Sequence, residues 1–212
     1  MPFGTGEEAV EGTPVPSDDE PACFPAAATV ELADGSTTEL AALSAGMAVR
    51  VAQGAHTGAH SHVYGWSHRQ LDGRHTYVRL SHVPEAAAGD ERPAPRHLLL
   101  SPGHLLYVGG SLVPARSVRV GDALATPGVA GGVSRVVATG TTTAAGKVNP
   151  HTLSGDLLVD GVRVSTYTDA LPTVVAHALL APARAAFRAG LSVEPMGRLL
   201  YGGVPGWRRW WA

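Results

Sequence analysis

A single cysteine, Cys23, stands where a polar, proline-rich segment gives way to a series of short apolar runs. A thiol at this junction can attack the carbonyl of the preceding residue, Ala22, through a five-membered ring and convert the Ala22–Cys23 amide into a thioester. This N–S acyl shift needs a proton donor for the departing nitrogen, a group that stabilises the oxyanion, and strain on the scissile bond. A buried packing role is the alternative for Cys23, because lone cysteines are commonly buried.

The sequence LSPGHL at residues 100–105 supplies candidate partners for the thiol. The Pro-Gly pair predicts a turn, which allows Ser101 and His104 to face one space from neighbouring strand ends. A histidine that titrates near neutral pH can protonate a leaving amine, and a hydroxyl can hydrogen-bond to the amide. The alternative is an ordinary turn with a hydrogen-bonded histidine, since a serine and a histidine at this spacing are common.

Composition excludes several classes of protein. One cysteine excludes an internal disulfide framework, a multi-cysteine zinc site and an iron–sulfur cluster. Lysine and arginine number 16 against 18 aspartate and glutamate, a net charge of −2 that argues against nucleic-acid binding. No run of about 18 apolar residues is present, so we expect no membrane span.

A metal or other cofactor is not expected. His56, His60 and His62 are close enough in sequence to chelate a metal ion, but their glycine-rich surroundings lack the fixed geometry of a helix or strand pair. We therefore expect residues 54–62 to be a solvated polar loop. Residues 85–96 are predicted to form a second long loop.

The middle of the chain is predicted to be mostly β. Asp34-Gly35, Gly109-Gly110 and Asp160-Gly161 each lie between apolar runs and predict hairpin turns. A repeat supports this prediction, because residues 35–49 match residues 110–124 at an offset of 75 with four identities. Because the turn and strand signals occur at the same positions in both copies, the repeat predicts two related β-subdomains. The predicted strands lie at residues 28–32, 47–51, 77–80, 98–100, 105–108 and within 157–164.

The two ends of the chain differ from its middle. Residues 1–22 predict a solvated, disordered segment without the pattern of a signal peptide. Residues 173–191 predict a helix that Pro182 kinks or splits and Gly190 ends, with His177 as a hydrogen-bonded core histidine. The sequence WRRWW at residues 207–211 could contact lipid or pack back on the domain.

Four ordered motifs resemble the Hint domain of the hedgehog C-terminal autoprocessing (Hog) region. They are CFPAAATVELADG and LSAGMAVRV between residues 23 and 51, LLLSPGHLLYV at 98–108 and LSGDLLVDGVRVSTY at 153–167. The resemblance continues into AHALLAPARAAF at 176–187, which is similar to the helix that follows the Hint module in hedgehog proteins. The resemblance implies a mostly β, horseshoe-like Hint fold of two pseudo-symmetric subdomains with a short C-terminal helical extension. The implied divisions are an upstream cleaved segment at 1–22, the Hint domain at 23–169 and the extension at 170–212.

The resemblance also implies roles for individual residues. Cys23 would be the thioester nucleophile, and Ser101 and His104 fall on the family's T-x-x-H positions, with Ala22 where the family typically has glycine. Sterol-transferring members carry an aspartate general base upstream of that motif, and His68 falls there in VYGWSHRQ at 63–70. We therefore expect water, a sterol-like alcohol or another small nucleophile to resolve the thioester, with His68 as candidate base. The alternative for His68 is an exposed polar residue.

Other functions remain as alternatives. Splicing inteins end in a His-Asn or Gln pair, whereas Asn149, the one asparagine, follows a valine, so we expect cleavage only upstream of Cys23. The chain could instead be a degenerate Hint module that no longer cleaves and acts as a β binding domain, or a cysteine peptidase acting in trans. The expected partners are the chain's own N-terminal segment and a small nucleophile or lipid, and we expect a monomer. Relatives pass through the secretory pathway, but the sequence itself does not predict a location.

Overall fold

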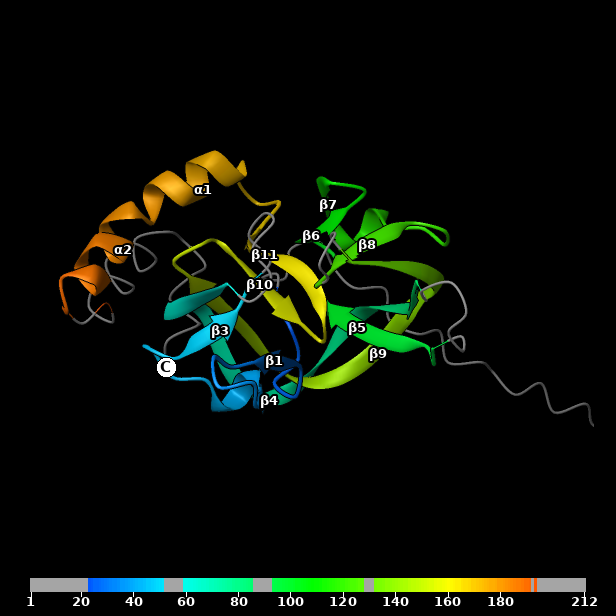
Figure 1. Ribbon diagram of the computed structural model, residues 1–212, viewed down its shortest axis with the longest axis horizontal. Helices are drawn as coiled ribbons and strands as arrows, with labels where there is room; N and C mark the ends of the chain where they lie inside the picture. Colours follow the sequence, from blue (N-terminus) through cyan, green and yellow to red (C-terminus); the bar gives the residue numbers. More distant parts are fainter. Residues whose placement is uncertain (1–22, 52–58, 86–92, 128–131, 192, 194–212) are drawn as a thin grey trace, which may run out of the picture.

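The computed structural model describes residues 23–51, 59–85, 93–127, 132–191 and 193 as a mostly β structure with two short helices (Figure 1). The elements follow, in chain order: β1 (Thr29–Glu31), β2 (Thr37–Glu39), β3 (Ala48–Arg50), β4 (His60–Pro84), β5 (Arg96–Leu100), β6 (His104–Val108), β7 (Ser111–Pro114), β8 (Ala123–Thr126), β9 (Gly132–Thr152), β10 (Asp156–Val159), β11 (Val162–Thr168), α1 (Thr173–Leu179) and α2 (Ala181–Arg188).

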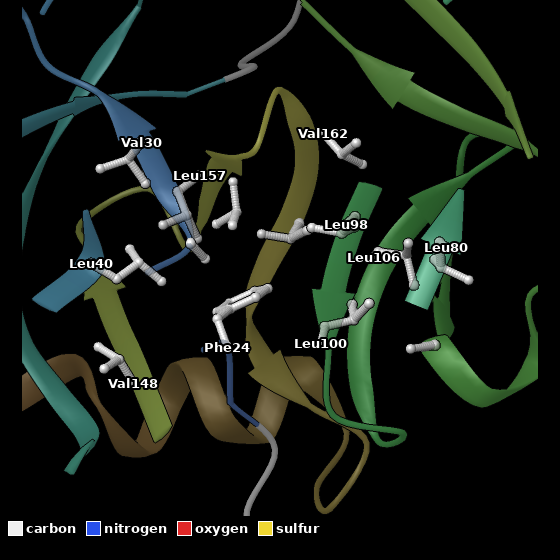
Figure 2. Packing of buried hydrophobic residues seen from close by; sticks show 14 of the residues in the cluster. Phe24, Val30, Leu40, Leu80, Leu98, Leu100, Leu106, Val148, Leu157 and Val162 are labelled. Carbon is white, nitrogen blue, oxygen red and sulfur yellow. The ribbon is translucent and has the colours of Figure 1, made fainter. Parts of the chain in front are cut away.

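Antiparallel pairing joins nine of the described strands into one sheet. Its main order is β10-β11-β6-β8-β9-β4-β3, while β5 pairs with β4 and β7 pairs with β6. Strands β1 and β2 form a separate hairpin. The apolar core lies between these parts and includes Phe24, Leu40, Leu98, Leu106 and Leu157, all fully buried (Figure 2). Phe24 therefore anchors the start of the described chain in the centre of the molecule.

All three predicted hairpin turns are confirmed. Asp34-Gly35 connects β1 with β2, Gly109-Gly110 connects β6 with β7, and Asp160-Gly161 connects β10 with β11. In the last of these turns both residues have positive φ, 48° for Asp160 and 78° for Gly161. Two-residue hairpins favour such left-handed turns, because their twist matches that of the flanking strands.

The predicted internal repeat is also confirmed by the structure. Each copy contains a short strand, a 3-10 turn and a second strand: β2, Leu40–Ala42 and β3 in the first copy, then β7, Ala115–Ser117 and β8 in the second. Gly46 and Gly121, which are 75 residues apart, have φ values of 90° and 94°. The two copies therefore share the same backbone path.

The predicted polar loop at 54–62 is partly wrong, because β4 begins at His60 and also contains His62. His56 lies outside the described residues. The predicted strand at 77–80 is only part of β4, which spans 25 residues and pairs with the 21-residue β9. Neither full length was predicted, since the central part of this ribbon is polar and exposed on both strands. Across the part of the chain with defined placement, no three or more His, Cys, Asp or Glu side chains are grouped to hold a metal ion.

The predicted helix is confirmed as two helices. α1 and α2 meet at Leu180, Pro182 lies in the first turn of α2, and Gly190 follows with a φ of 75°. The prediction of a core histidine at His177 is wrong, because α1 buries none of its residues. His177 is nevertheless hydrogen-bonded, with 2.6 Å between its Nδ1 and the hydroxyl of Tyr167. Neither described helix is long and apolar enough to cross a membrane. Residues 1–22 and the WRRWW sequence lie outside the described residues.

Candidate active site

Cys23 and Ser101 are held together by three hydrogen bonds. The backbone N–H of Cys23 donates to Ser101 Oγ at 2.6 Å, and this hydroxyl donates to the carbonyl oxygen of Cys23 at 2.8 Å. The same carbonyl oxygen accepts a bond from the backbone N–H of Ser101 at 2.9 Å. Cys23 is fully buried, and Ser101 is 4 % exposed. A single hydroxyl therefore fixes the peptide groups on both sides of the Cys23 α-carbon, while Ala22 itself lies outside the described residues.

The predicted Pro-Gly turn places Ser101 and His104 on one side of this contact. Ser101 directly follows β5, His104 begins β6, and the N–H of His104 donates to the Ser101 carbonyl at 3.0 Å. The turn packs against Asp169, whose N–H donates to the Gly103 carbonyl at 3.0 Å. Arg116 pairs with the Asp169 carboxylate at 2.5 Å. The turn is thereby held from two other segments of the chain.

The His104 ring is oriented by β11 and by Phe24. Its Nε2 lies 2.9 Å from the carbonyl oxygen of Ser165, and its centroid lies 4.1 Å from that of the Phe24 ring. A carbonyl oxygen only accepts, so Nε2 must carry a hydrogen, and in the neutral ring Nδ1 is the nitrogen with a lone pair. His104 can therefore take up and return a proton through Nδ1.

The strand pairing of Phe24 fixes the position of Cys23 beside β9. Phe24 and Val148 exchange two backbone hydrogen bonds of 2.9 Å, an isolated antiparallel bridge. In Figure 2 the two labelled side chains lie on neighbouring segments in the core. The chain thus runs alongside β9 at Cys23, and β4 runs along the other side of β9.

His68 comes from β4 and is buried, so the alternative of an exposed residue is wrong. Its strand partner on β9 is Asn149. Burial, and secondarily the positive charge of Lys147, lower the pKa of His68 from 6.5 to about 4, despite an opposing hydrogen bond to the Ser67 backbone. His68 is therefore neutral near pH 7 and able to act as a base. It lies two strands from Cys23, across β9, whereas Ser101 contacts Cys23 directly.

β9 and β11 contribute polar residues that the motifs did not identify. His151 is buried, and burial lowers its pKa to about 3, with His104 and then Arg184 adding smaller effects of the same sign. Asn149 and Thr166 are also buried, and the Asn149 side-chain amide donates to the Thr166 carbonyl at 3.4 Å. From the sequence, Asn149 had meaning only in relation to splicing. The available signal was a polar run, NPHT at 149–152, beside an apolar strand, but its neighbours depend on the register.

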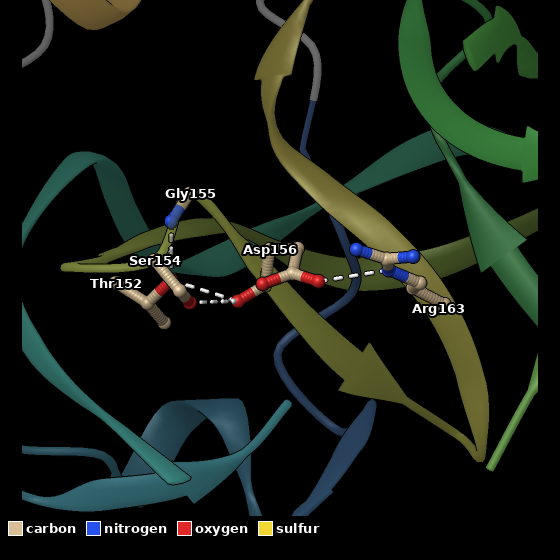
Figure 3. Close-up of polar contacts among 5 residues, drawn as sticks. All are labelled: Thr152, Ser154, Gly155, Asp156 and Arg163. Carbon is tan, nitrogen blue, oxygen red and sulfur yellow. Dashed lines mark hydrogen bonds and ion pairs between the residues drawn. The ribbon is translucent and has the colours of Figure 1, made fainter. Parts of the chain in front are cut away.

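The turn between β9 and β10 holds the end of β9 close to β10 and β11 through hydrogen bonds. The Thr152 hydroxyl donates to the backbone carbonyl of Asp156 at 2.7 Å, and Gly155 N–H donates back to that hydroxyl at 3.2 Å. The Asp156 carboxylate accepts from Arg163 on β11 at 2.8 Å (Figure 3). These contacts tie β11, and with it Ser165, to the end of β9.

Solved structures with a similar fold include inteins. The gp41-1 intein is 8 % identical with a TM-score of 0.50, over 69 % of this chain and 99 % of that one. A variant of the MchDnaB-1 intein is 13 % identical with a TM-score of 0.50, over 67 % and 98 %. A bacterial intein-like domain from Clostridium thermocellum is 22 % identical over 68 % and 97 %, with a TM-score of 0.46. At these identities the first two show a shared fold.

The predicted β fold with two related subdomains is the Hint fold of these inteins. A family model described as the Hint module matches residues 15–194 of the sequence, which is most of the chain. This match includes Cys23, Ser101, His104 and His68. The chain therefore belongs to the Hint module family.

Proposed function

We propose that this protein cleaves its own chain at the Ala22–Cys23 bond. Hint modules support self-processing in general. The observation that carries the specific proposal is the Ser101 hydroxyl, which accepts from the nitrogen of the scissile bond at 2.6 Å. His104 lies in the same turn, and its ring contacts the Phe24 ring at a tilt of 57°. No cofactor is needed for this chemistry.

The first step is an N–S acyl shift. His104 Nδ1 takes the proton of the Cys23 thiol, and the thiolate sulfur attacks the carbonyl carbon of Ala22. When the C–N bond breaks, the proton passes from Nδ1 to the Cys23 nitrogen, leaving a thioester and a free amine. Ser101 orients the nitrogen throughout, which aligns the amide for attack.

The second step transfers the acyl group to water, a sterol-like alcohol or another small nucleophile. The nucleophile's oxygen or other attacking atom bonds to the thioester carbonyl, the C–S bond breaks, and the Cys23 sulfur is protonated. We assign His68 as the base that receives the nucleophile's proton, because burial keeps its imidazole neutral near pH 7, although a pKa of about 4 makes it a weak base. An imidazole at this position, rather than a carboxylate, favours small nucleophiles over strict sterol dependence.

Intact-mass measurement tests the first step. The wild-type chain and Cys23→Ala are incubated with and without dithiothreitol, which resolves thioesters. Only the wild type should yield a fragment that begins at Cys23, and dithiothreitol should accelerate its appearance. If the folded, reduced wild-type chain stays intact under both conditions, cleavage is excluded and a non-cleaving binding module becomes the better description. A labelled peptide added in trans should remain uncut.

A pair of histidine variants on one strand tests the second step. His68→Ala should still react with dithiothreitol but should release its upstream segment more slowly in water, by about 10²-fold for loss of a general base. His60→Ala, an exposed position on the same strand, is the matched control and should resemble the wild type. Unchanged release in His68→Ala would remove His68 from the mechanism.

A further inference from the structure

The side-chain amide of Asn149 is buried, and its oxygen is not used in the hydrogen bonds that its nitrogen makes. Asn149 is 2 % exposed, and its Nδ2 donates to Ser67 Oγ at 2.8 Å and to the Thr166 carbonyl at 3.4 Å. The carbonyl of Thr166 can only accept, so the amide orientation is fixed with nitrogen on that side. Among the residues that the structure describes, Asn149 Oδ1 has no hydrogen-bond partner. A buried acceptor without a donor is costly, which suggests that a donor arrives during the reaction.

The strand register places Asn149 beside Cys23. Phe24 and Val148 form an isolated hydrogen-bonded antiparallel bridge, and extending its register by one residue sets Cys23 opposite Asn149. Such non-hydrogen-bonded pairs bring side chains closest, with about 4.5 Å between α-carbons. His68 faces Asn149 from the other side of β9. Asn149 thus lies between the candidate nucleophile and the candidate base.

Asn149 and His104 are linked indirectly, through the backbone of β11. Asn149 donates to the carbonyl of Thr166, and His104 donates through Nε2 to the carbonyl of Ser165, the preceding residue. Both side chains are therefore attached to neighbouring peptide groups of β11. β11 therefore fixes the position of Asn149 relative to His104, the histidine that would move the proton in the acyl shift.

The acyl shift changes what Cys23 can donate. As an amide, its nitrogen has one hydrogen, which Ser101 accepts. As an amine, it has two, or three when protonated, and Cys23 is fully buried. We propose that Asn149 Oδ1 accepts a hydrogen bond from this new amino group and so stabilises the thioester against the reverse S–N shift. This inference rests on the proposed cleavage, and it concerns the position of the first equilibrium.

The hydrogen bonds of Asn149 exclude a role as donor to the oxyanion of the acyl shift. An amide nitrogen can donate two hydrogen bonds, and both hydrogens of Asn149 Nδ2 are used in the contacts with Ser67 and Thr166. Asn149 is therefore not a donor to the oxyanion of the tetrahedral intermediate. Only its oxygen is available, and this oxygen can accept a hydrogen bond from an amine.

A rapid trap with hydroxylamine separates the equilibrium from the rates. The full chain is mixed with excess hydroxylamine, and the fast burst measures thioester already present while the slow phase measures its formation. Asn149→Leu, which keeps the size but removes the acceptor, should lower the burst about tenfold. Asn149→Asp should restore most of the burst, since either protonation state of its carboxyl group retains an acceptor oxygen. Val136→Ala, a buried core position on the same strand, is the control for lost stability and should keep the wild-type burst.

The outcomes distinguish this inference from the proposed function. A wild-type chain with neither burst nor slow cleavage overturns the proposed function itself. A wild-type burst that Asn149→Leu leaves unchanged, in a variant with a cooperative unfolding transition, overturns the role of Asn149 alone. A burst that falls equally in Asn149→Leu and Val136→Ala also overturns it, because the loss then follows stability. A selective fall that Asn149→Asp reverses supports it.

Discussion

At the scale of single residues, the Ser101 hydroxyl is the group on which the candidate site depends most. It accepts from one side of Cys23 and donates to the other, and both atoms of Cys23 that it contacts are buried. The hydroxyl therefore serves the folded structure as well as the proposed chemistry. Removing it leaves a buried N–H without its acceptor.

Ser101→Ala should consequently lower both stability and cleavage. We expect the free energy of unfolding to fall by about 1–3 kcal/mol for the unsatisfied donor. We expect cleavage in dithiothreitol to slow by about 10²-fold, because the scissile amide is no longer oriented. Ser101→Thr keeps the hydroxyl and should stay within about tenfold of the wild-type rate. Urea unfolding and the cleavage time course measure the two effects, and equal rates in all three proteins would contradict the role of the hydroxyl.

The sequence identified residues whose type or local spacing indicates chemistry, but not residues whose role depends on neighbours far away in the chain. Cys23 is unique in the chain, and Ser101 and His104 lie around one short turn, so their proximity follows from local geometry. Asn149 contacts Ser67 and Thr166, which are 82 and 17 residues away. The pairing of β4 with β9 brings Ser67 to Asn149, and the position of β11 beside β9 brings Thr166 there. Neither long-range arrangement is visible in a single sequence.

At the scale of elements, the turn between β5 and β6 sets the distance from Ser101 to His104. A Cβ atom at Gly103 would overlap Oδ1 of Asp169, the carboxylate that pairs with Arg116. The space for the turn is therefore limited by a segment 66 residues further along the chain, which the Asp169 N–H bond also holds in place.

Gly103→Ala should force the Asp169 carboxylate aside and weaken its pairing with Arg116, which helps to hold the turn. Because the end of a flexible side chain gives way, we expect a loss of about 1 kcal/mol in the free energy of unfolding, and slower cleavage. Gly140→Ala is the matched control, since a Cβ there meets no atom within 4 Å, and it should change stability by less than about 0.5 kcal/mol. Chemical denaturation of both variants measures the difference. A Gly103→Ala protein as stable and active as Gly140→Ala would show that the turn tolerates displacement.

Short elements were predictable and long ones were not. The hairpins follow from dipeptides such as Asp160-Gly161, because positive φ is a local property of those residues. The β4–β9 ribbon contains polar segments such as residues 69–76, which lack an apolar face and resemble loops in sequence. Their strand structure comes from backbone pairing with β9, a long-range interaction.

At the scale of the whole molecule, burial of neutral histidines couples folding to pH. Burial lowers the pKa of His68 and of His82 from 6.5 to about 4, and that of His151 to about 3. Between pH 6.5 and about 4 the unfolded chain therefore binds more protons than the folded chain at these positions. Their contribution to stability is full above pH 6.5 and is lost as the pH falls through this window.

The free energy of unfolding should accordingly be lower at pH 5 than at pH 7. His82→Gln isolates one contribution, because His82 bonds to Ser134 at 2.6 Å and has no part in the proposed cleavage. This variant should lose less stability between the two pH values than the wild type does. Urea midpoints at pH 5, 6 and 7 provide the measurement. Parallel pH profiles for the two proteins would mean that His82 does not contribute.

The long separations in the candidate site bear on the timing of cleavage during protein synthesis. Ser101 follows Cys23 by 78 residues, and Ser165, which orients His104, follows that histidine by a further 61. A ribosome adds about 5–20 residues per second, so the thiol emerges on the order of ten seconds before its last partner. For the proposed cleavage, this delay is an interval in which whatever precedes Cys23 can fold while still attached to the growing chain.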